Sequence, residues 1–364
     1  KLKARILRVL QISLENTSMV LRTEIKTHAD NRGISIFLGH NSALEYWRLH
    51  ERNPFLSPTR ACIEQSATQG YKTLDTGALE RIGIINQPIH LVVSNAGQRR
   101  RSKSLKPHVM SQHLPDRCFL KVASGIYVST PELCFLQMAE TLSLSKLIEL
   151  GFELCGYYGK DPHGESRPLV KLQPRTTPAR IKTLLNRCSG VPGVLNAKRA
   201  IGYVLADFAS PMETILAMLL CLPQNLGGYG LPRPKMNHHV STQNPKPASA
   251  NVSGLYGFWC DLCWPEQKFA LEYDSDAFHA GSEKLNKDSR RRTLIELEDY
   301  HVLSVTKKQL YDQAAFDELA QACAKSLEFR LRIRNQRFHS NKYKLRKELL
   351  FERCRQTEWV GPQG

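Results

Sequence analysis

The chain has 364 residues and a mass of 41.3 kDa, long enough for two domains that each bury a core. Hydrophobic residues make up 41% and charged residues 23%, a globular composition that excludes a wholly disordered chain. The excess of 51 Lys plus Arg over 34 Asp plus Glu leaves a net charge of +17. This charge favours polyanionic partners, nucleic acid foremost, with a membrane surface or plain solubility as the other interpretations.

Hydropathy and cysteine usage indicate the compartment. The longest apolar run, residues 215–222, is far shorter than the roughly 20 residues that a membrane-spanning helix needs, so we expect no transmembrane segment. Residues 1–18 carry basic and apolar side chains without a small-residue cleavage site, which argues against a signal peptide. The ten cysteines are scattered among apolar residues, as is typical of reduced thiols. We therefore expect a cytoplasmic protein.

Residues 1–205 are predicted to form an N-terminal mixed α/β domain. Apolar runs predict strands at Ile89–Val93 and at residues 125–128, and helix-start signals follow at Pro131 and Ser143. No motif in this region names a reaction. We therefore assign it a targeting or regulatory role.

Residues 206–364 are predicted to form a second domain. It opens on a helix with Ser210 as N-cap, proline at the first helical position and Glu213 three residues after the cap. Glu213 either completes a capping box or belongs to a site, and spacing alone leaves both open. Proline, asparagine and serine then accumulate over residues 231–253, which predicts a long loop with a short strand near His239.

Strands and helices alternate after that loop. The pattern predicts strands at residues 258–264, 269–274 and 301–306, a long helix over residues 282–299, and another helix from Tyr311. This order is typical of an α/β or α+β domain built on a mixed sheet.

Two of these strands carry carboxylates among apolar residues. Because strand side chains alternate, Glu272 and Asp274 share one face of their strand. The four-residue connector at residues 265–268 is about a minimal hairpin, which places Trp264 opposite Phe269 and Asp261 opposite Glu272. Residues that lie opposite each other in an antiparallel pair project to the same face, so the sequence predicts adjacent carboxylates.

Adjacent carboxylates repel unless a positive charge lies between them. Oxygen-rich sites suit Mg²⁺ or Mn²⁺, and a bound metal ion activates water, so we expect Asp261 and Glu272 to bind such an ion with Asp274 at the rim. The alternative is an exposed hairpin face with ordinary surface acids. Three carboxylates on one face beside apolar partners favour the site.

The same hairpin contains a CxxC motif, Cys260 and Cys263. Residues three apart in a strand are expected to point to opposite faces, which disfavours their joint binding of zinc. His238 and His239 are the only tempting additional ligands. A zinc-stabilised adaptor is therefore the third hypothesis for this chain.

Basic residues cluster in three places, and each has a structural alternative. The cluster at residues 99–106 is best explained as a solvated loop. The segment at residues 325–355 has 11 Lys plus Arg against three Glu and either holds a DNA backbone or forms a solvated helix face. The helix at residues 282–299 offers either a phosphodiester contact or an exposed ion pair, through Asp288, Arg290, Arg291 and Arg292.

Residues 210–306 resemble the very-short-patch-repair-endonuclease-like branch of the PD-(D/E)XK nucleases. The similarity lies in the order of a helix with Glu213, a strand with Asp261, the strand "LEYD", His279, "DSRR" and a last strand "HVLSVT". It implies a restriction-endonuclease-like mixed sheet flanked by helices. It further implies that Asp261 and Glu272 bind the metal ion, that Glu213 and Asp274 support the site, and that His279 and Arg291 handle water or phosphate.

The sequence departs from the family pattern at several positions. Asp274 stands where the family has a lysine, as it does in this branch, so that lysine cannot orient the attacking water. Ser275 replaces a usual glycine, His279 comes one residue late, and Asp299 stands where a glycine commonly precedes the tyrosine. These departures bear on activity more than on fold.

We therefore expect a metal-dependent DNA endonuclease that uses Mg²⁺ or Mn²⁺. The rival hypothesis is a DNA-binding regulator that keeps the nuclease fold without turnover. The N-terminal part is faintly similar to antitoxins of the bacterial abortive-infection type, and phage defence follows only by analogy. The target sequence and whether the chain forms a homodimer stay open.

Overall fold

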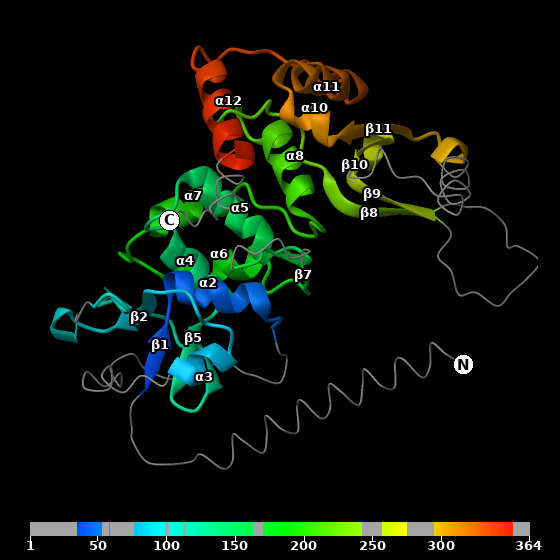
Figure 1. The fold of residues 1–364 in the computed structure, drawn as a ribbon. Helices are drawn as coiled ribbons and strands as arrows, with labels where there is room; N and C mark the ends of the chain where they lie inside the picture. Colours follow the sequence, from blue (N-terminus) through cyan, green and yellow to red (C-terminus); the bar gives the residue numbers. More distant parts are fainter. Residues whose placement is uncertain are drawn as a thin grey trace, which may run out of the picture. The chain divides into compact units, whose positions relative to one another are not determined.

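A computed structural model describes residues 35–52, 58, 76–98, 102–111, 114–162, 170–241, 257–274 and 295–351. The chain divides into two compact units (Figure 1). Unit 1 contains the chain up to Tyr46 together with Asn53–Gln137, and unit 2 contains Trp47–Arg52 and the chain from Met138 onward. The boundary that the sequence suggested, after residue 205, falls inside unit 2.

Unit 1 is built on a five-stranded mixed sheet in the order β3-β2-β1-β5-β4. β1 runs parallel to β5 and antiparallel to β2, β2 runs parallel to β3, and β4 and β5 form an antiparallel pair. Two of these strands confirm the predictions for residues 89–93 and 125–128. The five strands are β1 (Ile36–Leu38), β2 (Ile89–Val93), β3 (Leu105–Val109), β4 (Phe119–Ala123) and β5 (Ile126–Ser129).

Helices complete the core of unit 1. Every residue of β2 is buried, and so are Phe37 of β1 and Phe135 of α4, so apolar side chains of strand and helix share one interior. The helix predicted after Pro131 is confirmed as α4. The helices are α2 (His40–Leu49), α3 (Thr76–Arg81) and α4 (Pro131–Met138), with a short 3₁₀ turn η3 at Ala96–Gln98.

Unit 2 begins with helices that are capped by hydroxyl side chains, and the start predicted at Ser143 is confirmed. Ser143 Oγ accepts the N–H of Lys146 at the start of α5, and Thr177 Oγ1 accepts the N–H of Arg180 at the start of α6. The elements of this part are α5 (Leu144–Leu154), β6 (Tyr158–Gly159), β7 (Val170–Lys171), α6 (Pro178–Arg187), α7 (Val194–Ile201) and α8 (Pro211–Cys221).

A four-stranded mixed sheet, in the order β11-β10-β9-β8, forms the second part of unit 2. The predicted hairpin is confirmed, because Trp264 pairs with Phe269 across β9 and β10. β10 and β11 are parallel, and β8 and β9 are antiparallel. The strands are β8 (Lys235–Ser241), β9 (Gly257–Trp264), β10 (Phe269–Asp274) and β11 (His301–Thr306), with η5 (Pro265–Gln267) in the hairpin connection.

The remaining described elements of unit 2 are helical. The helix expected from Tyr311 begins at Gln313 as α11, where Asp312 accepts the N–H of Ala315, and a separate short helix, α10, ends at Tyr311. Gly227 has φ 94, and a Cβ there would lie 2.4 Å from the carbonyl oxygen of Asn341, so only glycine lets η4 approach α12 this closely. The elements are η4 (Gln224–Leu226), α10 (Lys307–Tyr311), α11 (Gln313–Ser326), α12 (Phe338–Arg346) and a π-helical turn η6 (Lys347–Phe351).

The expected fold class, mixed α/β with helices flanking mixed sheets, is confirmed. One detail of the strand prediction is wrong: Cys260 and Cys263 do not point to opposite faces. Both lie in one buried cluster with Phe258, and the Cys263 thiol is hydrogen-bonded to Cys260. The alternation of side chains along β9 is interrupted between the two cysteines. β8 and β9 form backbone pairs at Met236 with Leu262 and at His238 with Cys260, but not at the position between them, where Asn237 has a left-handed backbone (φ 41).

Across the described ranges, no helix is long and apolar enough to cross a membrane.

Candidate functional site

The four carboxylates singled out by the sequence all lie on elements of unit 2. Glu213 is in the first turn of α8, Asp261 is on β9, and Glu272 and Asp274 are on β10. In β10 the residues before Glu272 are buried and those from Glu272 onward are half-buried. The carboxylates therefore occur where the strand leaves the apolar core.

Glu213 is held by hydrogen bonds to three residues. It is 7% exposed, its N–H donates to Ser210 Oγ at 3.2 Å, and its Oε2 accepts the N–H of Ala209 at 3.0 Å and Nδ2 of Asn237 at 3.1 Å. The cap at Ser210 is confirmed, but Glu213 reaches back to Ala209 instead of closing a capping box. Burial, followed by the negative charge of Asp261, raises the pKa of Glu213. Glu213 and Asp261 are thus electrostatically coupled carboxylates on neighbouring elements.

Asp261 ends the ladder between β9 and β10. The last backbone pair is Leu262 with Leu271, and beyond it Asp261 Oδ2 accepts the N–H of Tyr273 at 2.8 Å. Glu272 directly follows Leu271 on β10, and Asp261 directly precedes Leu262 on β9. Each residue is therefore one position beyond the last backbone pair on its strand, as the hairpin register predicts. The Asp261 side chain replaces a ladder hydrogen bond and is fixed in orientation by it.

Asn237 is a member of this site that the sequence did not identify. Its Nδ2 donates to Glu213 Oε2 and to the carbonyl oxygen of Asp207, the latter at 2.6 Å. Its φ of 41 lies in the left-handed region, which asparagine tolerates better than most residues. The only signal in the sequence was an asparagine at the start of the predicted loop, and its partners lie 24 and 30 residues away.

A cavity of about 400 Å³ opens beside Asn237. It is lined by residues 205–207 and 234–239, so Lys235, His238 and His239 lie at its wall with Asn237. The ring of His239 lies 4.9 Å from that of Trp259, which is 61% exposed. Cationic, aromatic and acidic groups therefore adjoin one another on β8 and β9.

The donor set is compatible with a hard divalent cation. Mg²⁺ is usually bound by one or two carboxylates and keeps several waters. Within the described residues, no three of the four carboxylates bring oxygens mutually within 4.8 Å, so a site with one or two protein ligands fits this arrangement and an all-protein cage does not. No third histidine, cysteine, aspartate or glutamate ligand accompanies Cys260 and Cys263 in the described parts of the chain, so the zinc hypothesis gains no support.

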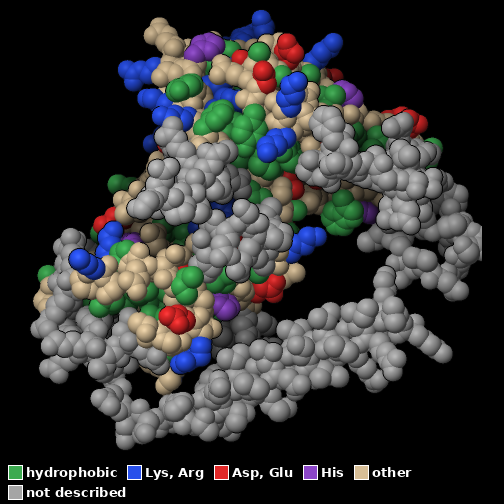
Figure 2. Space-filling view, viewed as in Figure 1, with side chains coloured by type: hydrophobic (Ala, Val, Ile, Leu, Met, Phe, Trp, Pro, Cys, Tyr) green, Lys and Arg blue, Asp and Glu red, His purple; other side chains and the backbone are tan. Residues whose placement is uncertain are grey.

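The basic C-terminal segment separates into structural and exposed residues. Lys342 and Arg346 are buried: Lys342 Nζ donates to both carboxylate oxygens of Asp317 at 2.8 Å, and Arg346 Nη2 donates to the carbonyls of Leu310 and Tyr311. Figure 2 shows Lys and Arg side chains gathered over the part of unit 2 that holds α11 and α12. The exposed members are Lys325, Arg330, Arg332, Arg334, Arg337, Lys344 and Lys347.

Several predicted site residues lie outside the described residues. Asp299 is described, and its φ of 55 shows that the position where glycine was expected has the left-handed backbone that glycine adopts most readily. The residues outside are His279, Asp288, Arg290, Arg291 and Arg292, together with Ser275.

Comparisons with protein-family models, with curated proteins and with solved structures found no match for this chain.

Proposed function

We propose that unit 2 carries a metal-dependent DNA endonuclease site with a restriction-endonuclease-like arrangement, in which Asp261 and Glu272 bind Mg²⁺ or Mn²⁺. The observation that carries the proposal is the meeting of α8, β8 and the β9–β10 hairpin at two acids, with Glu213 fixed by Asn237 and coupled to Asp261, which accepts the N–H of Tyr273. The resemblance of residues 210–306 to PD-(D/E)XK nucleases supports the same residues. The net charge of +17 supports a polyanionic substrate.

Each residue has a distinct role in this proposal. Bound to Asp261 and Glu272, the ion would supply a Lewis acid and lower the pKa of a water molecule. Glu213 raises the local negative charge and is itself oriented by Asn237. The Tyr273 N–H fixes the Asp261 carboxylate, which reduces the reorganisation needed when a substrate arrives. Exposed basic residues of α12 and its flanking turns hold the phosphate backbone.

The second candidate is a DNA-binding regulator without turnover. It is favoured by Asp274, which stands where a nuclease of this superfamily has a lysine, and by the absence of a three-carboxylate cluster among the described residues. This candidate binds DNA through the same basic residues, with salt dependence but without need of a metal ion.

Supercoiled plasmid distinguishes the two candidates. Purified full-length protein is incubated with plasmid in Mg²⁺, in Mn²⁺ and in EDTA, and the Asp261→Ala/Glu272→Ala double variant is run beside it. The nuclease proposal expects nicking in either metal and none in EDTA or with the double variant. Salt-sensitive plasmid binding that is the same in metal and in EDTA, without any nicking, would instead support the regulator.

A further inference from the structure

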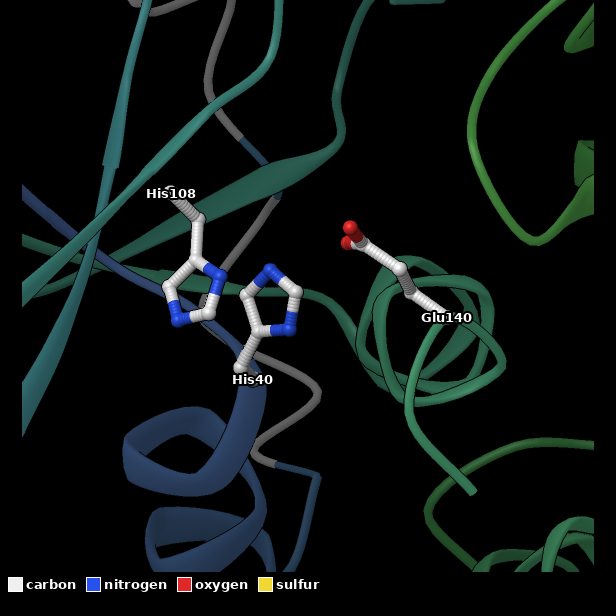
Figure 3. Close-up of side chains that lie close together, drawn as sticks. All are labelled: His40, His108 and Glu140. Carbon is white, nitrogen blue, oxygen red and sulfur yellow. The ribbon is translucent and has the colours of Figure 1, made fainter. Parts of the chain in front are cut away.

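The histidine cluster of unit 1 is occupied by its own side chains. His108 Nε2 lies 3.0 Å from His90 Nδ1, and the rings of His40 and His108 stack with centroids 3.5 Å apart (Figure 3). His40 is 3% and His90 6% exposed, so these two rings are not presented to a ligand in solution. The exposed basic residues of unit 2 differ in this respect.

An exposed row of arginines lies between α11 and α12. We call it the arginine comb and define it as Arg330, Arg332 and Arg334. All three residues are exposed, whereas Phe329 and Leu331 beside them are half-buried. Among the described residues, none of the three guanidinium groups has a hydrogen bond or an ion pair. Residues 329–347 contain no aspartate or glutamate, so the charge of the comb is not neutralised by its own segment.

Gln224 holds the middle of this segment. Its Nε2 donates to the carbonyl oxygen of Arg332 at 2.7 Å, and its Oε1 accepts the backbone N–H of Arg334 at 3.1 Å. A parallel β-strand bonds the same two groups, the carbonyl of one residue and the N–H two residues later. The side-chain amide of Gln224 thus takes the place of a neighbouring strand and keeps residues 332–334 extended.

Both ends of the segment are fixed as well. The N–H of Phe329 donates to the carbonyl of Ala324 at 2.8 Å, where the chain leaves α11 through Glu328 with a left-handed backbone (φ 51). Asn335 Oδ1 accepts the N–H of Arg337 at 2.8 Å, where the chain turns into α12. The comb is therefore held in place by the fold before any ligand arrives.

The geometry of the comb suits the backbone of a nucleic acid. Residues 329–335 form neither helix nor turn, and alternate residues of an extended chain project to one side at intervals of about 6.6 Å. This spacing is close to that of successive phosphates along one strand, and a guanidinium can bond a phosphate bidentately. Contacts to phosphate carry no sequence information, and one row of cations needs only one strand.

The basic surface continues onto α12. Asn341 Nδ2 donates to the carbonyl of Asn225 at 3.0 Å, so η4, which carries Gln224, lies against this helix. Arg337 and Lys344 come four residues before and three residues after Asn341, so both flank this contact, and both are exposed. Figure 2 shows Lys and Arg side chains gathered over this part of unit 2. A strand bound to the comb therefore has further cations beside it.

We propose that the arginine comb binds successive phosphates of a single nucleic-acid strand, with Gln224 as the residue that positions it. The inference rests on the proposed function, because both of its candidates bind nucleic acid, and it adds how one strand is held. It does not involve the acidic residues of unit 2. Binding measured in EDTA therefore tests it apart from cleavage.

The test compares the full-length wild type with Gln224→Ala and Arg332→Gln. Fluorescence anisotropy of a labelled single-stranded oligonucleotide is measured in EDTA at several salt concentrations. Gln224→Ala changes no charge, so we expect its affinity to fall roughly 5–30-fold, the cost of ordering the backbone of one residue, while the slope of log affinity against log salt stays that of the wild type. Arg332→Gln should lower that slope by about 0.7, the value for one phosphate contact of a single strand.

Two matched controls accompany these variants. Asn225→Ala is a neutral change at the exposed neighbour of Gln224, and it retains the backbone carbonyl that contacts α12. Arg199→Gln removes an exposed charge from a different helix, α7. Both should keep the affinity and the salt slope of the wild type. Melting temperatures verify that every variant is folded.

Four results would overturn the proposal. They are a wild type that does not bind the single strand, a folded Gln224→Ala that binds like the wild type, a full salt slope in Arg332→Gln, and displacement of the oligonucleotide by poly-glutamate as readily as by unlabelled oligonucleotide. The last result would assign the surface to acidic protein segments. A plasmid that is never nicked would remove the nuclease proposal and leave this one standing, because the binding assay contains no free metal ion.

Discussion

Replacement of Asn237 separates the side-chain and backbone contributions to the acidic site. The side chain donates to the Glu213 carboxylate and to the Asp207 carbonyl, and the backbone is left-handed. A hydrogen bond to a charged acceptor contributes about 1.5–3 kcal/mol and a neutral one about 0.5–1.5 kcal/mol, with the lower end applying to the exposed bond at Asp207. A left-handed backbone costs alanine about 1 kcal/mol more than it costs glycine or asparagine, since glycine lacks a Cβ and asparagine can hydrogen-bond locally.

We therefore expect Asn237→Ala to lower the free energy of unfolding by about 3 kcal/mol and Asn237→Gly by about 2 kcal/mol. Urea unfolding followed by tryptophan fluorescence measures both, because Trp259 and Trp264 lie on the adjacent strand β9. Asn196→Ala is the matched control: Asn196 donates to the carbonyls of Ala139 and Leu142 from a right-handed helix, so only neutral hydrogen bonds are lost.

The reasoning is refuted in two ways. Equal costs for the alanine and glycine variants would show that the left-handed backbone carries no penalty. Costs within about 0.5 kcal/mol of the wild type for both would show that the bond to Glu213 does not hold the site, since that range is typical of surface substitutions.

Three further predictions concern charge. Glu213→Gln keeps the two hydrogen bonds that the side chain accepts and removes the repulsion from Asp261. Because the pKa of Glu213 is raised in the folded protein, the wild type loses stability as pH rises through that pKa. The variant should therefore melt no lower than the wild type at pH 8, and its plasmid nicking should fall. The pKa of Glu153 is about 2, because the charge of Arg48 and further basic contacts outweigh burial; Glu153→Gln should cost about 3 kcal/mol in urea unfolding at pH 7 and progressively less below pH 4.5. Lys344→Gln should leave melting unchanged and reduce the salt slope of DNA binding by about one.

Local signals made the hairpin and the helix start predictable. A four-residue connector between two apolar runs leaves little freedom in register, so the pairing of Trp264 with Phe269 follows from length alone. Ser210 caps α8 because its hydroxyl is placed by the chain itself. Such features depend on neighbours in sequence, and the sequence contains all the information that they need.

Long-range features were not predictable. The two thiols of the CxxC motif share a face because β8, which begins 25 residues before Cys260, interrupts the alternation at Asn237. His40, His90 and His108 are separated by 50 and 18 residues and meet only because β1, β2 and β3 are neighbours in a sheet whose order no local pattern specifies. Partners set by sheet order require the fold before they can be named.

The most direct test of the nuclease proposal is the rate of plasmid nicking by Asp261→Asn in Mg²⁺ with enzyme in excess. Asparagine keeps an oxygen to accept the Tyr273 N–H, so the hairpin is retained while the charge is lost. Glu266→Gln, in the hairpin connection, removes an acid of the same hairpin away from the site. The account predicts that Asp261→Asn loses at least roughly 100-fold in rate, the size seen when one charge-stabilising group is removed from an active site, and that Glu266→Gln nicks like the wild type. Equal nicking by all three proteins would contradict it.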